Sequence, residues 1–316
     1  MRLLGAQGLG KSKVALPLLL ALLGWGLSVQ PASAKLHTLS KLAVIGDSYS
    51  DGGNSGWLTK ATAPPGFPFP FYADGRFSNG PVAMEQLWSL FNPSLPPLQP
   101  SLAPGGGSNY AVGGATSGRE SYLQVAPGMP SALQTLYANT SAYTQLGQVL
   151  SDYTPGSFDP SSTLFTFWMG PNDALYWMNT KPVGSPDGFT PGTINGGSPV
   201  QATAENMLLN AMSNIGSGVQ ALINNGAQHL LVPNLLDFSK APAFSGDPGQ
   251  AAAVKSLIFG FNQGLQQTLN QLRVANPGVD IMGFDNAALF DRIFSNPSSY
   301  GFNNSTEACT TIENPV

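Results

Sequence analysis

The sequence predicts an α/β fold in which a parallel sheet lies between two layers of helices. Short apolar runs that suit buried strands alternate with longer segments in which apolar residues recur every three or four positions, as on one face of a helix. This alternation favours parallel βαβ units with helices on both faces of one sheet. After an N-terminal leader is set aside, the remaining length suits a single domain with one core.

Residues 1–34 have the three regions of a secretory signal peptide. A positively charged region without acidic residues ends at Lys13, an apolar stretch follows over Val14–Val29, and an A-x-A cleavage pattern ends at Ala34. The apolar stretch is short for a bilayer-spanning helix and is interrupted by proline and glycine. We therefore expect a secreted or periplasmic protein whose mature part, residues 35–316, has no transmembrane segment.

Four apolar runs are predicted to be the strands of the sheet, and a fifth, shorter run is a further candidate. In chain order they are Leu42–Ile45, Asn109–Val112 (the short candidate), Thr163–Met169, His229–Leu235 and Val279–Phe284. The four longer runs are almost continuously apolar, which is typical of strands that are buried on both faces. The sheet is therefore expected to be parallel and enclosed.

Helices are predicted where apolar residues repeat at helical spacing. They are Val82–Phe91 with Pro81 at its first position, Ser141–Tyr153, Ala204–Ile223, Val254–Leu272 and Ala287–Phe294. Methionine and aromatic residues within these stripes are predicted to be core residues and not a cofactor site. Two Gly/Pro-rich segments, Ala63–Tyr72 and Asn179–Pro199, are predicted to be loops that line a substrate cleft.

The composition argues against several classes of function. A net charge of −4 with 9% charged residues leaves no basic patch for nucleic acid. Cys309 is the single cysteine, so an internal disulfide and a cysteine-based zinc site are excluded. With His37 and His229 as the only histidines, a histidine-based metal site is not expected either. We predict no metal and no cofactor, and the sequence leaves the oligomeric state open.

Three strand ends share one kind of turn, in which a glycine is followed or preceded by small polar residues. They are Gly46-Asp47-Ser48, Asn109–Gly114 and Gly170–Asp173. In a parallel sheet the carboxyl ends of the strands meet at one edge, so these turns are expected to converge.

Together the three turns could carry out acyl transfer. The Ser48 hydroxyl would attack a carbonyl, and the N–H groups of Ser48, Gly114 and the Asn172 amide would stabilise the oxyanion. Taken alone, the first turn also fits a plain strand-to-helix turn in which Asp47 and Ser48 cap backbone N–H groups.

The same stretches resemble the blocks of the GDSL (SGNH) family of serine esterases and lipases. GDSYSDGGN (residues 46–54) is similar to the first block, NYAVGGAT (109–116) to the second and GPND (170–173) to the third. RFSNG (76–80) and VPNL (232–235) also resemble the larger secreted members. The nucleophile elbow of α/β-hydrolase lipases, G-x-S-x-G, does not occur.

This resemblance covers the mature chain from Leu42 onward and implies the SGNH hydrolase fold, a three-layer α/β/α sandwich with a flavodoxin-like parallel sheet. It also implies Ser48 as the nucleophile, Gly114 and Asn172 as oxyanion donors, and a carboxylic ester as substrate, whether a small molecule, a lipid or a glycan ester.

The resemblance fails at the C-terminal end. The family's last block is Asp-x-x-His, whose histidine is the general base, and Pro297–Val316 resembles only the segment that precedes this block. We therefore expect the domain to be C-terminally incomplete and its catalytic competence to be in question. His37 follows the cleavage site, and His229 begins a strand at the amino edge of the sheet, so neither has the position of a base. A non-catalytic protein that binds acyl chains or glycans in the same cleft is the alternative.

Overall fold

The computed structural model describes residues 39–64, 66–68, 72–180 and 204–307. The predicted signal peptide, His37, most of the Asn179–Pro199 loop and Cys309 lie outside these residues. Within the described part of the chain, no helix combines the length and apolar character needed to cross a membrane.

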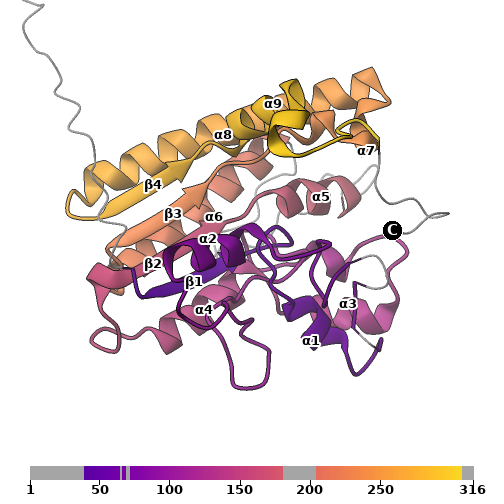
Figure 1. The fold of residues 1–316 in the computed structure, drawn as a ribbon. Coiled ribbons are helices and arrows are strands. Elements are labelled where there is room, and N and C mark those ends of the chain that lie inside the picture. The colour runs from indigo at the N-terminus through magenta and orange to yellow at the C-terminus, as the bar shows by residue number, and fades with distance from the viewer. Residues whose placement is uncertain (1–38, 65, 69–71, 181–203, 308–316) are drawn as a thin grey trace, which may run out of the picture. The chain divides into compact units, whose positions relative to one another are not determined.

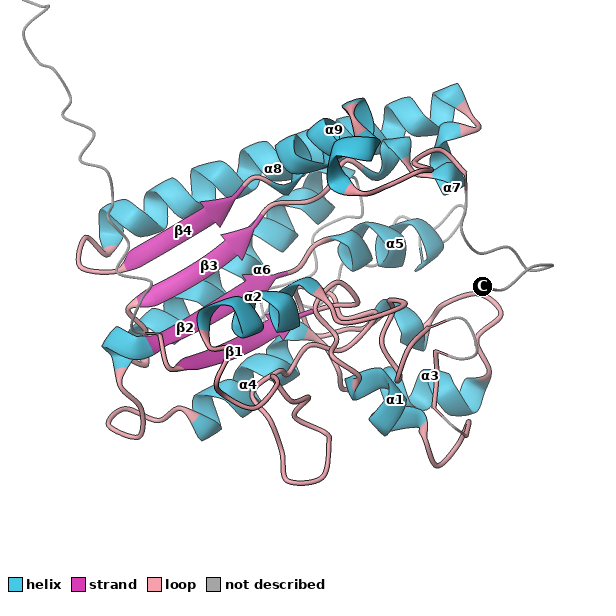
Figure 2. Ribbon diagram, viewed as in Figure 1, coloured by secondary structure: helices cyan, strands magenta, loops and turns pink. Residues whose placement is uncertain are grey.

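Four parallel strands form the sheet, in the spatial order β1 (Lys41–Gly46), β2 (Thr163–Trp168), β3 (His229–Pro233) and β4 (Asp280–Phe284). The register places Gly46 opposite Trp168, so the ends of β1 and β2 lie level with each other. The four longer predicted runs are therefore confirmed as strands, and Figure 2 shows them side by side.

The short predicted strand Asn109–Val112 lies along the free edge of β1 but is not a regular strand. Val44 and Gly46 of β1 exchange backbone hydrogen bonds with residues 108–112 at 2.9–3.2 Å, yet only an isolated bridge results. The carbonyls of Asn109 and Ala111 accept from the side-chain Nδ2 of Asn54, at 2.7 and 2.8 Å. The strand prediction was thus wrong, although the position outside β1 is the one that a flavodoxin-like sheet requires.

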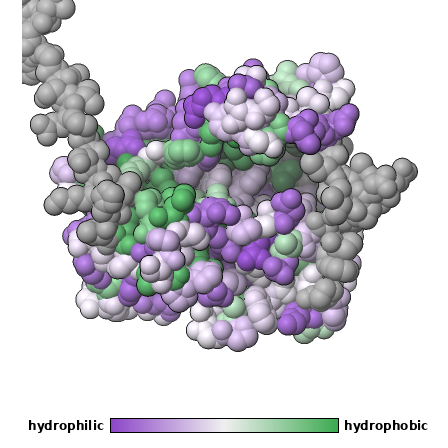
Figure 3. Space-filling model, in the orientation of Figure 1, coloured by the Kyte–Doolittle hydropathy of each residue, from purple (hydrophilic) through white to green (hydrophobic). Residues whose placement is uncertain are grey.

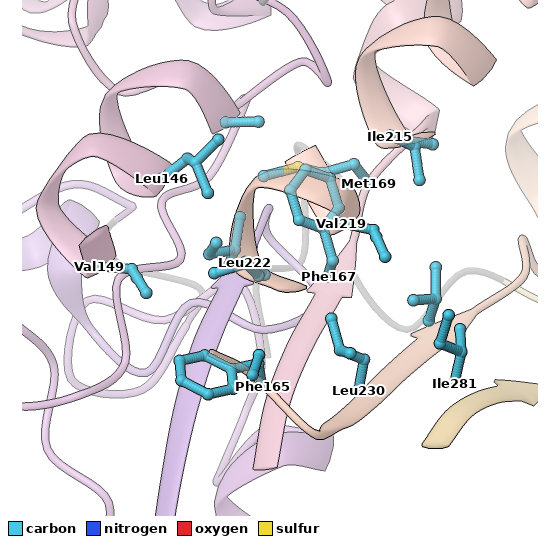
Figure 4. Packing of buried hydrophobic residues seen from close by; sticks show 14 of the residues in the cluster. Leu146, Val149, Phe165, Phe167, Met169, Ile215, Val219, Leu222, Leu230 and Ile281 are labelled. Carbon is cyan, nitrogen blue, oxygen red and sulfur yellow. The ribbon is translucent and has the colours of Figure 1, made fainter. Parts of the chain in front are cut away.

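One face of the sheet is covered by three helices, α4 (Ala142–Asp152), α6 (Ala204–Asn224) and α8 (Pro248–Ala275). Their buried side chains and those of the strands form the main core, part of which is drawn in Figure 4. The labelled contacts include Leu146 and Val149 of α4, Ile215, Val219 and Leu222 of α6, and Phe165, Phe167, Leu230 and Ile281 of the strands. The prediction that methionine and aromatic residues of the stripes are core is confirmed by Met207 and Phe261, which are buried.

The other face is covered by α2 (Ala83–Phe91), which packs on β1 and β2 (Figure 1). Leu231 and Met282, from the next two strands, are only half-buried on this face, and Phe284 is 47% exposed. Apolar surface accordingly gathers around α2 and the neighbouring strands in Figure 3. The described residues therefore form three layers, with the sheet in the middle. The helix layer on the α2 side covers less of the sheet than the layer of α4, α6 and α8 does.

The predicted helices are confirmed, with α9 (Asn286–Ser295) as the last. Pro81 is not the first helical residue as predicted, because Val82 is the N-cap of α2 and its N–H donates to the Glu85 carboxylate at 2.9 Å. The sequence did not predict α1 (Asn54–Thr59), α3 (Ser131–Tyr137), α5 (Pro171–Thr180) and α7 (Pro242–Ser245), or the 3₁₀ helices η2 (Tyr122–Gln124), η3 (Pro160–Ser162), η4 (Phe238–Lys240) and η5 (Pro297–Tyr300).

Candidate active site

The three predicted strand-end turns meet at the carboxyl edge of the sheet, next to the end of β1. The Val112 N–H donates to the Gly46 carbonyl at 3.2 Å, which joins the first turn to the second. The Asn172 Nδ2 donates to the Ala115 carbonyl at 3.1 Å, which joins the third turn to the second. The geometry therefore brings the stretches that carry Ser48, Gly114 and Asn172 together.

Asp51 ties the first two turns to each other. Its carboxylate is fully buried and accepts hydrogen bonds from the Gly53 N–H at 2.8 Å, the Ser55 hydroxyl at 2.6 Å and the Gly113 N–H at 2.9 Å. Burial raises the pKa of Asp51, whereas these hydrogen bonds lower it. A satisfied buried carboxylate of this kind holds the segment after β1 against the glycine turn.

Further polar side chains that the sequence analysis did not select complete this framework. Asn109 Nδ2 donates to the Ser50 carbonyl at 2.8 Å. Gln145, from α4, brackets the end of β1, since its Oε1 accepts from the Gly46 N–H at 2.9 Å and its Nε2 donates to the Gly46 carbonyl at 3.0 Å. Asn109 lies within the second block that resembles the family. Gln145 could have been noticed as a polar residue inside an apolar helical stripe.

Three N–H groups beside this framework have no acceptor among the described residues. Among the described residues, the backbone N–H groups of Ser48 and Gly114 donate to no protein acceptor. The Asn172 amide uses one N–H on Ala115, and an amide nitrogen carries two. These donors are the ones an oxyanion of acyl transfer would need.

Gly114 is held in a conformation that a side chain would oppose. Its φ is +80°, in the left-handed region, and an added Cβ would lie 2.5 Å from the Leu123 Cγ. Glycine therefore allows both the turn and the close packing of Leu123 against its backbone.

The candidate nucleophile, Ser48, lies in a tight turn and is half-buried. Asp47 caps the turn, since its Oδ1 accepts from the Tyr49 N–H at 3.0 Å. The Ser48 hydroxyl makes no hydrogen bond to any described residue. The simple capping role is thus confirmed for Asp47 but not for Ser48.

Three buried carboxylates, those of Asp47, Asp51 and Asp173, lie close to this turn, and burial raises the pKa of each. Burial, together with the charges of Asp173 and Asp51, raises the pKa of Asp47 to about 7. Its Oδ2 has no hydrogen-bond partner. Burial also raises the pKa of Asp173 to about 6, although Asp173 accepts from the Ser117 hydroxyl at 2.6 Å. Over the described ranges, no group of three or more His, Cys, Asp or Glu residues is arranged to hold a metal ion.

No imidazole reaches Ser48 from the described residues. His229 pairs with Leu164 near the start of β2, and its Nδ1 lies 3.7 Å from the Asp280 carboxylate. This is the amino edge of the sheet, as predicted, whereas Ser48 lies at the carboxyl edge. His37, the other histidine, is outside the described residues.

Comparisons with known proteins give one family. The sequence profile described as GDSL-like Lipase/Acylhydrolase matches residues 42–315. The chain is 29% identical over 309 residues to "Uncharacterized protein in trpE-trpG intergenic region" of Pseudomonas putida, an alignment that covers 92% of this chain and 44% of that protein. It is 25% identical over 292 residues to Acetylajmalan esterase 2 of Rauvolfia serpentina, with 86% and 76% covered.

A third relative is Thermolabile hemolysin of Vibrio parahaemolyticus, 26% identical over 287 residues, with 89% of this chain and 54% of the relative covered. The chain thus spans about half of the length of the two bacterial relatives. The family profile covers most of the chain and includes all three strand-end turns. The chain therefore belongs to the GDSL-like lipase/acylhydrolase family.

Proposed function

We propose that this chain is an exported hydrolase of carboxylic esters in which Ser48 is the nucleophile. The observation that carries the proposal is the set of N–H donors at the carboxyl edge, from Ser48, Gly114 and Asn172, that are not taken up by the protein. A buried donor without a partner is costly. A fold that keeps such donors together is suited to a ligand that brings an oxygen with developing negative charge.

In this reaction the Ser48 Oγ attacks the ester carbonyl carbon, and the carbonyl oxygen becomes an oxyanion. The N–H groups of Ser48, Gly114 and the Asn172 amide donate to that oxyanion, each contributing on the order of 3 kcal/mol to transition-state stabilisation. The Ser48 hydroxyl proton passes through a water molecule to the leaving alkoxide as the bond between the carbonyl carbon and the alcohol oxygen breaks. A second water then hydrolyses the acyl–Ser48 ester, which frees the acid and restores the Ser48 hydroxyl.

The test is labelling with a fluorophosphonate probe, followed by peptide mapping. We expect the label on Ser48, no label in Ser48→Ala, and full labelling in Ser50→Ala, which removes a buried hydroxyl two positions away. Asn172→Ala should slow labelling by roughly a hundredfold or more, as for loss of one oxyanion donor. Gly114→Ala keeps its N–H but opposes the φ of +80°, so it should slow labelling by displacing that N–H. Folded wild-type protein that takes no label would contradict the proposal.

A non-catalytic role in binding acyl chains or glycans is the second candidate, and the position of His229 favours it. Loss of the histidine of a serine triad costs about six orders of magnitude in turnover, whereas the oxyanion donors and the cleft do not depend on the histidine. This role predicts saturable ester binding that Ser48→Ala leaves unchanged. Slow cleavage of every bound ester that Ser48→Ala abolishes would exclude it.

Export is the remaining part of the proposal. The charged, apolar and small-residue regions of residues 1–34 support it. N-terminal sequencing of protein recovered from the periplasm or the medium of an expressing bacterium should give Lys35 as the first residue. Intact protein that is retained in the cytoplasm with Met1 would contradict export.

A further inference from the structure

An apolar cavity of about 260 Å³ lies directly beside the candidate site. Ser48 and Asn172 do not line it, but their chain neighbours Tyr49 and Pro171 do. We propose that this cavity binds the acyl chain of the ester and selects medium-length chains. The inference rests on the proposed function, because it takes the same Ser48 as the point where the chain is attached.

The wall nearest to Ser48 is aromatic. The Tyr49 ring stacks between two others, with centroids 5.4 Å from Trp168 and 6.4 Å from Phe238. Tyr49 and Phe238 line the cavity, whereas Trp168 belongs to β2. A rigid stack that starts at the residue after Ser48 gives an apolar chain a continuous surface leading away from the reacting carbon.

The remaining walls of the cavity come from four helices. Residues of α5, of the first turns of α6, of α7 and of α8 line the cavity, among them Ala174, Phe244 and Ile258. Apart from the Tyr49 hydroxyl, the lining side chains carry no polar group. Such a lining gives nothing for a sugar hydroxyl to bind, and it matches a saturated hydrocarbon chain.

The size of the cavity sets the length of the chain. An apolar protein cavity of about 150 Å³ accommodates benzene, with six carbons. By the same measure a cavity of about 260 Å³ has room for about ten carbons. Longer chains would have to leave their last carbons in water.

The experiment is isothermal titration calorimetry of the Ser48→Ala protein with saturated fatty acids of increasing length, from butyric to tetradecanoic acid. We expect the affinity to rise about fourfold for each methylene, the equivalent of about 0.8 kcal/mol per buried CH₂, and to level off near ten carbons. Affinity that does not depend on chain length, or that still rises steeply at fourteen carbons, would overturn the proposal.

Paired variants test where the acyl chain binds. Ala241→Phe fills the cavity from η4–α7 and should move the plateau to shorter acids, whereas Phe244→Ala enlarges the cavity and should move it to longer ones. Ala252→Phe, an equal change on the exposed side of α8, should change nothing. Wild-type length dependence in folded Ala241→Phe and Phe244→Ala would overturn the assignment.

A second comparison separates the two ends of an ester. In the Ser48→Ala background, binding of methyl decanoate should be weakened by Ala241→Phe, and binding of decyl acetate should not. The opposite pattern would make this an alcohol-side pocket and overturn the proposal. Fluorophosphonate labelling is the independent readout. Retained fatty-acid binding without labelling would reject the proposed function alone, and labelling without length dependence would reject only the acyl pocket.

Discussion

The two sides of the Ser48 turn are built differently. On the side of the glycine turn, Asp51, Asn109 and Gln145 hold the backbone through hydrogen bonds at 2.8–3.0 Å that are buried from water. On the side of the cavity, the Tyr49 ring stacks on the rings of Trp168 and Phe238, and the other lining side chains are apolar.

This difference separates two tasks. A buried polar network has essentially one satisfied arrangement, so it can fix N–H donors to within a fraction of an ångström. An apolar wall tolerates changes of volume at modest cost. Substitutions on the network side should therefore damage folding and the reaction geometry together, whereas those on the cavity side should change mainly which chain is bound.

The largest effect is expected from Asp51→Ala, which removes the central acceptor of the network side. The Gly53 N–H and the Ser55 hydroxyl would lose their buried acceptor, and the Gly113 N–H would keep only a longer hydrogen bond to the Ser55 Oγ, at 3.3 Å. We expect a loss of about 4 kcal/mol or more in the free energy of unfolding. Urea unfolding followed by circular dichroism measures it.

Asp159→Ala is the matched control for Asp51→Ala. Asp159 also accepts from a backbone N–H, that of Ser161 at 2.9 Å, but on the exposed surface. The loss of unfolding free energy there should be much smaller than the loss in Asp51→Ala, because the freed N–H can donate to water. Equal losses of unfolding free energy in Asp51→Ala and Asp159→Ala would show that burial does not make the Asp51 hydrogen bonds more important. That result would contradict the comparison.

The second effect concerns pH. Since the pKa of Asp47 is about 7 in the folded protein, against 3.8 for an ordinary aspartate, the folded state binds more protons than the unfolded state between these values. The contribution of Asp47 to stability is therefore complete below about pH 3.8 and is lost as the pH rises to about 7. Asp173 acts in the same direction up to about pH 6.

Asp47→Asn should remove part of this dependence, because the amide oxygen can still accept from the Tyr49 N–H and no longer titrates. The difference in unfolding free energy between the variant and the wild type should then shift in favour of the variant by a few kcal/mol between pH 4 and pH 7. A difference that stays constant over that range would show that Asp47 titrates normally.

The sequence predicted the strands well and the site only in part. Runs such as Thr163–Trp168 are buried throughout. A continuous apolar run predicts a strand that is buried on both faces. Helix α5 was missed because Gly170-Pro171-Asn172 suggests a turn, yet Pro171 opens the helix, a position where its missing N–H costs nothing.

Two features of the site had no local signal. The hydrogen bond from the Gly113 N–H to Asp51 joins residues 62 positions apart. The Gly46 N–H, which would continue the pairing of β1 with residues 109–112, donates instead to the Oε1 of Gln145, 99 positions away. The resemblance to the family identified Ser48, Gly114 and Asn172 as candidates, but only the folded chain reveals which of their N–H groups the protein leaves unpaired.

The third effect tests how tightly the network side is packed. An added Cβ at Gly113 would lie 2.0 Å from the Phe77 ring, so Gly113→Ala should cost about 1–3 kcal/mol by overpacking. Phe77→Leu should recover part of that loss in the double variant, which a double-mutant cycle in urea measures. Strict additivity of the two changes would mean that the Phe77 ring does not limit this glycine.

The smallest effect is expected on the cavity side, from Tyr49→Phe. The Tyr49 hydroxyl makes no hydrogen bond to a described residue, and the ring that stacks on Trp168 and Phe238 is retained. The free energy of unfolding should change by less than about 0.5 kcal/mol. Tyr49→Ala, in contrast, removes the ring and should cost about 3 kcal/mol. Both are read from urea unfolding, and a Tyr49→Phe loss close to that of Tyr49→Ala would mean that a polar contact of the hydroxyl, and not apolar stacking, supports this side of the Ser48 turn.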